Sequence, residues 1–327
     1  MTAASAPAPA SCSVVVCTHD PGRFGELERV VAALSRQTRP PDEVVVVVDH
    51  EPALLARASA ELAGVTVVPN DRVPGLGGAR NTGIARSSGE VVAFVDDDAI
   101  PEDEWLERLL EGYADPRVAG VGGAIEPRWE PERPAWFPRE FDWVVGCSYV
   151  GLPTAPTFVR NLIGCNMSYR RELLERTGGF HLGYGCDETE LCIRVAQQDP
   201  SARFLYQPAA RVHHLVPAAR LRLRRFFSRC YFEGGSKAVV ARLVGHVDGL
   251  ASERSYTSRV LPRAVAAGLA SAVRDRDPYG AARAGVVVAG LASTVAGFVA
   301  GSVRPERAAA ARGWSEPALR RTGTRPA

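Results

Sequence analysis

The stretch VVAFVDDDAIP (residues 91–101) joins an apolar run to three consecutive aspartates. Such a run of valines and a phenylalanine is typical of a strand that is buried on both faces of a sheet. Side chains alternate along a strand, so we expect Asp96 and Asp98 to share one face and Asp97, the structural member, to face the other way. Adjacent carboxylates repel one another, and a hard divalent cation relieves that repulsion because it prefers oxygen ligands. The stretch therefore predicts a buried strand ending in a cation site, against the simpler alternative of a solvated acidic turn.

Apolar runs and helical patterns alternate before this stretch. The runs predict strands at 12–18, 44–48 and 65–69, and the helical spacing predicts helices at 26–38 and 53–62. A glycine-rich loop at 73–81 opens a third helix, which ends at Arg86. This alternation predicts an α/β sheet of parallel strands with helices on both faces.

Polar residues follow three of these strands at the point where each strand ends. They are Thr18, Asp49 and the aspartates 96–98. In open α/β sheets the ligand binds at the carboxyl ends of the strands. The sequence therefore predicts a single ligand-binding edge that collects these side chains.

The pattern is less regular after residue 101. We expect helices at 102–114 and 186–198, strands at 118–125 and 202–208, and a strand followed by a helix at 164–180. Residues 126–160 contain several prolines and three tryptophans, and a long irregular segment of this kind is typical of a functional loop. His213 and His214 follow the last predicted strand.

The C-terminal part of the chain has a different character. Residues 220–238 mix arginines with aromatic residues, and residues 284–303 are an uncharged stretch of 20 residues, long enough to span a membrane. Small residues recur there at every fourth position, which lets helices approach closely in a membrane or in a soluble bundle. They are Gly285, Ala289, Ser293, Gly297 and Gly301. The sequence therefore leaves two alternatives for residues 284–303, a membrane helix and a packed helix of a soluble bundle.

Charge is distributed unevenly along the chain. Residues 1–215 hold 20 basic and 30 acidic residues, whereas residues 216–327 hold 19 and 7. The acidic part suits cation binding, and the basic part suits an anionic membrane surface. We expect no nucleic-acid partner, because no recognised binding module accompanies the arginines. The seven cysteines, without zinc spacing, and an N-terminus without a secretory signal predict the cytoplasm.

These patterns predict four segments. A disordered tail at 1–11 precedes an α/β domain at 12–216. A basic and apolar helical extension at 217–303 and a second disordered tail at 304–327 complete the chain.

Four segments in this order resemble the inverting glycosyltransferases of family 2, of the bacterial type. They are VVVCTHD, ALSRQTRPPDEVVVVVDH, GGARNTGIARSSGEVVAFVDDDAIP and GCNMSYRRELLERTGGFHLGYGCDETELCIRV, and the resemblance covers roughly residues 12–216. It implies the GT-A fold, with a mostly parallel central sheet flanked by helices, here followed by a C-terminal helical extension. It also implies a nucleotide-diphosphate sugar as the donor and Mn²⁺ or Mg²⁺ as the cofactor.

The resemblance also assigns roles at the predicted cation site. Asp98 matches the family's metal ligand, and Asp96 matches a residue near the ribose or the metal. His214 matches a histidine that completes the metal shell, since imidazole also suits Mn²⁺.

Three further residues match positions that contact the nucleotide. Thr18 matches a residue that lines the nucleotide, Asp49 the acid that reads the nucleobase, and Arg80 the basic residue near the diphosphate. The sequence DHEP contains Asp49, whereas the family often has two acids followed by Gly-Ser, so the identity of the base stays open.

An inverting transfer needs a carboxylate to take the proton of the acceptor hydroxyl. GYGCDETELCIR resembles the family pattern Gly-Glu-Asp-x-x-Leu-x-x-Arg, with the two acids in reverse order. Asp187 takes the position of the Glu, and Glu188 takes that of the Asp that serves as base. Glu188 is therefore the first candidate base and Asp187 the second. The simpler alternative is that these acids only favour a helix N-terminus.

The sequence thus predicts a metal-dependent inverting glycosyltransferase of cell-surface glycan or glycolipid synthesis. The expected acceptor is a glycan, a lipid-linked molecule or a small molecule. The expected location is the cytoplasm, with association with the inner face of the cytoplasmic membrane as an open alternative. A sugar-1-phosphate nucleotidyltransferase shares the sheet and the metal chemistry, but CTHDPGRFG lacks its glycine-rich signature. The third alternative is an inactive glycan-binding or scaffold homologue, against which the retained acids count.

Overall fold

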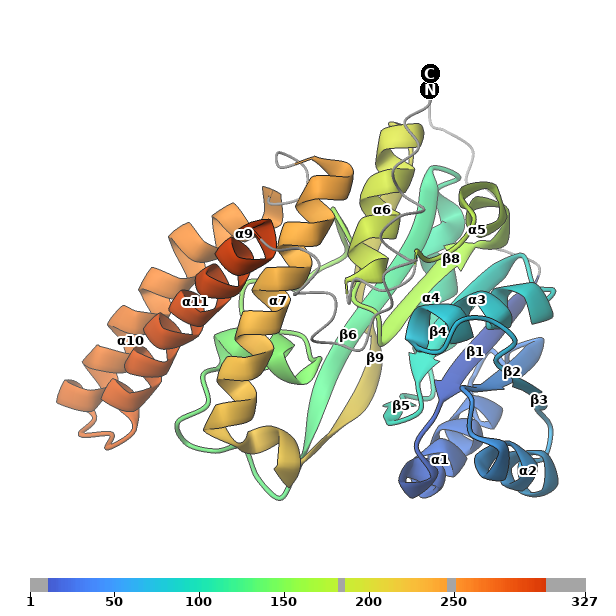
Figure 1. The fold of residues 1–327 in the computed structure, drawn as a ribbon, viewed down its shortest axis with the longest axis horizontal. Helices are drawn as coiled ribbons and strands as arrows, with labels where there is room; N and C mark the ends of the chain where they lie inside the picture. The colour runs from blue at the N-terminus through green and yellow to red at the C-terminus, as the bar shows by residue number, and fades with distance from the viewer. Residues whose placement is uncertain (1–10, 182–185, 246–250, 304–327) are drawn as a thin grey trace. The chain divides into compact units, whose positions relative to one another are not determined.

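The computed structural model describes residues 11–181, 186–245 and 251–303 (Figure 1). These residues form two compact units. The first unit comprises the described residues of 11–126, 153–181 and 187–215, and the second comprises the described residues of 127–152, 186 and 216–303. Residues 127–152, which we expected within the catalytic domain, therefore belong to the second unit. Both predicted tails lie outside the described residues, except for residue 11.

Four parallel strands form one half of the sheet, and helices connect them because parallel neighbours need a crossover. The elements are β1 (Cys12–Thr18), η1 (Pro21–Arg23), α1 (Phe24–Ser35), β2 (Glu43–Val48), α2 (Pro52–Glu61), β3 (Thr66–Pro69), α3 (Leu76–Arg86) and β4 (Val91–Asp96). The valines of β1, β2 and β4 are almost fully buried. This half confirms the predicted alternation of strands and helices.

The other half of the sheet is antiparallel. Its strands are β5 (Ala99–Pro101), β6 (Val118–Glu130), β7 (Thr157–Val159), β8 (Asn166–Arg170) and β9 (Arg203–Pro217). They extend the sheet in the order β3-β2-β1-β4-β8-β6-β9-β5, with β7 paired to β9. Among the described residues the sheet is therefore mixed and not mostly parallel, because an apolar run predicts a strand but not its direction.

The helices of this half are α4 (Trp105–Glu111), η2 (Gly112–Ala114), α5 (Arg171–Thr177) and α6 (Asp187–Gln198). Helix α4 begins later than predicted, at Trp105, because β5 ends only at Pro101 and the Glu102 amide still donates to the Arg211 carbonyl of β9 at 3.0 Å. Strand β9 itself continues well past the predicted end at residue 208. His213 and His214 lie within it and not after it, so alternation points their side chains to opposite faces.

Asn166 connects the middle of the antiparallel half. Its amide donates to the carbonyl oxygens of Ala124 and Ala210 at 2.9 Å each, and its oxygen accepts from Trp105 Nε1 at 2.8 Å. All of these bonds are buried, where each is stronger than in water. Strands β6, β8 and β9 and helix α4 are thereby held in one arrangement at the start of β8.

The second unit is mainly helical. It contains η3 (Arg139–Val145), η4 (Ala218–Leu221), α7 (Leu223–Val244), α9 (Ala251–Ser255), the π-helix η5 (Tyr256–Val260), α10 (Leu261–Arg274) and α11 (Gly280–Val303). Helix α11 packs along α7 and α10 (Figure 1). A Cβ at Gly297 would overlap the carbonyl oxygen of Tyr231, and one at Gly234 would overlap that of Thr294. The predicted close approach of helices therefore occurs between α7 and α11.

Substituting Gly297 tests this contact. We expect Gly297→Ala to lower the free energy of unfolding by about 1–3 kcal/mol, because the new methyl group must push the α7 backbone away. The matched control is Gly285→Ala in the same helix, where a Cβ meets nothing within 4 Å. That change should raise stability by up to ~1 kcal/mol, since alanine favours a helix. Urea unfolding measures both, and equal effects of the two variants would contradict the packing.

Candidate active site

The carboxyl edge of the parallel strands brings the predicted site residues of the first unit together. Residue Thr18 ends β1, and Asp96 ends β4, where it lies beside Cys17 in the strand register. The Asp49 amide, just after β2, donates to the Thr18 carbonyl at 2.8 Å. Three strand ends therefore meet as predicted, because parallel neighbours end at the same edge.

Asp97 is held by protein groups on both of its carboxylate oxygens. The Thr18 hydroxyl donates to Oδ2 at 2.7 Å, and Arg23 Nη1 donates to Oδ1 at 3.1 Å. Burial raises the pKa of Asp97, while the Thr18 hydrogen bond and the Arg23 charge oppose that rise. Asp97 is thus a buried residue that links η1 to the two strand ends, in agreement with the structural part expected of it.

Asp98 is also buried, and it faces His214. Its Oδ1 lies 3.2 Å from His214 Nε2, and its Oδ2 lies 3.1 Å from Arg23 Nη1. The pairing of Ala99 with His214 between β5 and β9 sets this contact. The expected separation of Asp97 from Asp98 onto two faces is wrong, because β4 ends at Asp96 and strand alternation does not continue through the turn.

Arg80 points into the protein from α3. It is only 3 % exposed, donates to the Gly164 carbonyl at 2.9 Å, and lies 3.6 Å from Asp96. Burial opposes its charge, but the nearby carboxylates of Asp96 and Glu188 raise the pKa of Arg80 above its ordinary value. The guanidinium therefore joins the end of β4 to the start of α6.

Asp49 fixes the loop before α3. Asn70 Nδ2 donates to its Oδ1 at 2.6 Å, and the Gly75 amide donates to its Oδ2 at 2.7 Å. His50 Nδ1 lies 2.8 Å from the same Oδ1. Burial would raise the pKa of Asp49, but these hydrogen bonds lower it below the usual range. Asp49 is thus an ionised carboxylate at the predicted nucleotide edge.

The acids at the start of α6 have different surroundings. Asp187 is 9 % exposed, whereas Glu188 is half-buried and lies near the guanidinium of Arg80. A Cβ at Gly164 would sit 3.0 Å from Arg80 Nη2 and 3.4 Å from Glu188 Oε2, so a larger residue there would have to displace both groups slightly. Glu190 Oε1 instead accepts a hydrogen bond from Arg194 Nε at 2.8 Å within the same helix, which is a structural role.

Three side chains could hold a metal ion. Asp96, Cys165 and His214 offer ligand atoms that all lie within 4.8 Å of one another. Metal–ligand bonds of about 2.0–2.3 Å place two ligands of one ion up to roughly 4.4 Å apart, so the group fits a divalent cation after small shifts. The sequence predicted Asp96, Asp98 and His214 but missed Cys165. Its only sequence signal is a cysteine placed directly before a strand, at GCN.

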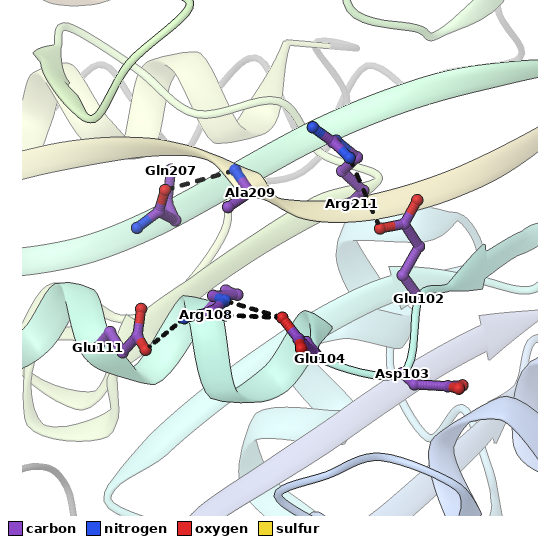
Figure 2. A pocket seen from close by; sticks show the side chains of 8 residues that line it. All are labelled: Glu102, Asp103, Glu104, Arg108, Glu111, Gln207, Ala209 and Arg211. Atoms are coloured by element: carbon purple, nitrogen blue, oxygen red, sulfur yellow. Dashed lines mark hydrogen bonds and ion pairs between the residues drawn. The ribbon is translucent and has the colours of Figure 1, made fainter.

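A pocket of about 440 Å³ lies elsewhere in the first unit (Figure 2). Its lining residues come from the segment before α4, from α4 itself and from β9: Glu102, Asp103, Glu104, Arg108, Glu111, Gln207, Ala209 and Arg211. None of the predicted site residues lines it. His213 is on its side of β9, with Nε2 3.0 Å from Glu102 Oε1. This separates His213 from the metal group and leaves His214 as the histidine of the site.

A mixed sheet with a carboxylate-rich parallel edge is the architecture of GT-A sugar-nucleotide transferases. A mannosyltransferase from Pyrobaculum calidifontis, solved with GDP-mannose and Mn²⁺, shares the fold with a TM-score of 0.56, 21% identity and 89% coverage of both chains. GalNAc-T7, solved with UDP, GalNAc and Mn²⁺, has a TM-score of 0.50 and 20% identity over 64% of this chain and 44% of that one. The GT-A fold is thereby confirmed.

Residues 13–178 match the family "Glycosyl transferase family 2", and the chain belongs to this family. A glucosyl-dolichyl phosphate glucuronosyltransferase of Haloferax volcanii is 33% identical over 70% of this chain and 76% of the relative. The succinoglycan biosynthesis protein ExoM of Rhizobium meliloti is 28% identical over 67% of this chain and 71% of the relative. The protein is therefore a nucleotide-sugar glycosyltransferase of glycan biosynthesis, as predicted. The Mn²⁺ in both solved relatives agrees with the predicted divalent cation.

Replacing Arg80 tests the buried contacts of its guanidinium with the Gly164 carbonyl and Asp96. We expect Arg80→Gln to lower the free energy of unfolding by about 2–3 kcal/mol, because the Gly164 carbonyl and Asp96 lose a buried cation. The loss stays below that of a fully buried pair, since the Asp96 side chain is 31% exposed.

The control is Arg86→Gln in the same helix. Arg86 pairs with Asp71 at 3.0 Å, but both side chains are about half exposed, at 53% and 49%. Its loss should cost less than about 1 kcal/mol. Denaturant unfolding measures the free energy of unfolding of both variants. An Arg80 variant as stable as the Arg86 variant would exclude a structural role for the Arg80 guanidinium.

Proposed function

We propose that this glycosyltransferase inverts the anomeric centre, with Glu188 as the base and with Asp96, Asp98 and His214 around a divalent cation. The observation that carries the proposal is the convergence of these groups at one edge of the first unit. Asp96 lies 3.6 Å from Arg80, and the charge of Glu188 acts on the same guanidinium. The donor and the base would then work within one small region.

The nucleotide end of the donor would lie along the strand edge. Thr18 and Asp49 stand at the ends of β1 and β2, and the hydrogen bonds of Asp49 hold its carboxylate ionised for a nucleobase or ribose donor group. A bound Mn²⁺ or Mg²⁺ supplies positive charge that stabilises the leaving diphosphate. Arg80 is buried among carboxylates, so we assign it a positioning role and not direct contact with the diphosphate.

Glu188 suits the base better than Asp187. A base must reach the acceptor hydroxyl, and Glu188 is half-buried whereas Asp187 is buried. As the acceptor oxygen bonds to the anomeric carbon, its proton passes to the Glu188 carboxylate, and the bond from that carbon to the diphosphate oxygen breaks. The positive charge of Arg80 lies near this carboxylate and attracts it.

Membrane association is the second part of the proposal. By length and composition α11 could cross a membrane. Its exposed positions are all apolar or glycine and recur at helical spacing: Ala281, Ala282, Gly285, Val288, Ala289, Ala292, Val295, Ala296, Val299 and Val303. The opposite side packs on α7, which carries Lys237 and Glu233, so we favour a helix lying in the interface over one that spans the bilayer.

The charge of this unit fits an anionic surface. Arg222, Arg224 and Arg225 at the start of α7 are exposed, as are Arg274 at the end of α10 and Arg276 after it. Basic residues are attracted to anionic headgroups by about 1 kcal/mol each. The name of the Haloferax relative specifies a lipid-linked sugar as its substrate. A lipid-linked acceptor at the inner face of the cytoplasmic membrane would account for the exposed arginines, the apolar side of α11 and the name of the relative.

Donor turnover tests the catalytic assignment. Purified full-length protein with Mn²⁺, a panel of nucleotide sugars and membrane lipid extract should release nucleoside diphosphate and label an acceptor. We expect Glu188→Gln and Asp98→Asn each to lower kcat by about 100-fold or more, because a base or a metal-binding group is lost. Glu172→Gln, at an exposed acid of α5, is the surface control.

Three outcomes would contradict these roles. Full activity of Glu188→Gln together with an inactive Asp187→Asn would move the base to Asp187. Pyrophosphate chemistry from a nucleoside triphosphate would favour the nucleotidyltransferase. Donor binding without any turnover by the unaltered protein would favour the scaffold.

Liposome flotation tests the membrane surface. The full chain should float with vesicles containing phosphatidylglycerol and less with phosphatidylcholine alone, and 1 M salt should reduce the binding because charge contributes. The double variant Val295→Asp/Val299→Asp should stay with the soluble fraction. Val73→Asp, an equally exposed valine in the first unit, should float like the unaltered protein. Flotation that resists both salt and the double change would contradict an interfacial helix.

A further inference from the structure

Cys165 lies at the metal group although no motif predicts a sulfur ligand there. It is 6 % exposed, and its neighbours in the group are the carboxylate of Asp96 and the imidazole of His214. The three residues come from different segments: the end of β4, the residue before β8, and the middle of β9. The Asn166 hydrogen bonds fix the start of β8 against β6 and β9, so the position of Cys165 is set by the buried sheet.

We propose that Cys165 is a ligand of the divalent cation, so that the site binds a transition metal such as Mn²⁺, Co²⁺ or Zn²⁺ in preference to Mg²⁺. On metal binding the thiol releases its proton to solvent, and the thiolate sulfur donates an electron pair to the ion. The inference concerns the cation site of the proposed function and rests on that function for its biological meaning.

The donor set explains the preference. Mg²⁺ takes oxygen ligands in a strict octahedron and keeps most of its waters, so sulfur and imidazole add little to its binding. Thiolate and imidazole favour softer ions, with affinity rising from Mn²⁺ through Co²⁺ and with Zn²⁺ also bound tightly. Asp96, Cys165 and His214 together form an oxygen, sulfur and nitrogen set that leaves further positions for the donor diphosphate and water.

Asp98, which the proposed function also places at this cation, contacts the histidine of the group. Its Oδ1 lies 3.2 Å from His214 Nε2, and a carboxylate beside a metal-binding histidine fixes the orientation of the ring. A cysteine that only filled the core would not need such neighbours. Cys192 illustrates that case, since it is fully buried in the hydrophobic core and its sulfur lies 3.6 Å from the Tyr169 hydroxyl.

Cobalt spectroscopy tests the sulfur ligand without reference to turnover. The full chain, stripped with a chelator, is titrated with Co²⁺, and a thiolate ligand produces a charge-transfer band in the near ultraviolet. We expect this band in the unaltered protein and its loss in Cys165→Ser. Cys17→Ser is the matched control, because Cys17 lies beside Asp96 in the β1–β4 register yet is not in the metal group, and it should keep the band.

Calorimetric titrations measure the preference itself. Cys165→Ser should bind Co²⁺ about tenfold or more weakly, while its affinity for Mg²⁺ changes less than about twofold. Persistence of the band in Cys165→Ser, its absence from the unaltered protein, or equal losses for both ions would overturn the inference. If Cys165→Ser does not fold, protection of Cys165 from alkylation by Co²⁺ but not by Mg²⁺ in the unaltered protein decides the matter, and lack of protection overturns it.

The two proposals can fail separately. A cobalt–thiolate band that depends on Cys165, in a protein that transfers no sugar from any donor, would retain the metal ligand and reject the function. Turnover that depends on Glu188, without such a band, would retain the function and reject the ligand.

Discussion

Neutralisation of buried carboxylates is the constraint on which the active edge depends. Asp97 and Asp98 are 3 % and 2 % exposed, and an isolated buried carboxylate costs several kcal/mol. Arg23 contacts both of them, and Arg80 lies against Asp96. Strand β4 can lead into three adjacent aspartates, two of them buried, because these two guanidinium groups lie against them.

The parallel topology supplies both signs of charge. A connection that leaves the carboxyl end of a parallel strand begins at the ligand edge. Arg23 follows β1 through η1, and Arg80 lies in the helix that follows β3. The crossovers that make the strands parallel thus also deliver the arginines. This arrangement leaves Asp96 as the more accessible of the three aspartates, since the others are already paired inside the protein.

Local patterns predicted the parallel half and its acidic edge well, because each strand is an apolar run followed by its polar residues. They failed where a residue's role depends on distant pairing. The turn at Asp97 and Asp98, the position of His214 inside β9, and the inward direction of Arg80 all follow from contacts between remote segments. Cys165 could not be found for the same reason, since its neighbours Asp96 and His214 are brought to it only by the completed sheet.

Helix α11 shows why two readings of one sequence need not exclude each other. Its small residues are compatible with both helix packing and a membrane segment. In the second unit the two properties belong to different sides of the helix. Gly290, Gly297 and Gly301 are buried against neighbouring side chains or α7 backbone, whereas Val288, Val295 and Val299 are each more than half exposed. Because the glycines bring one side of the helix close to α7, the exposed apolar surface lies on the other side, which suits an interface better than a bilayer interior that would surround the whole helix.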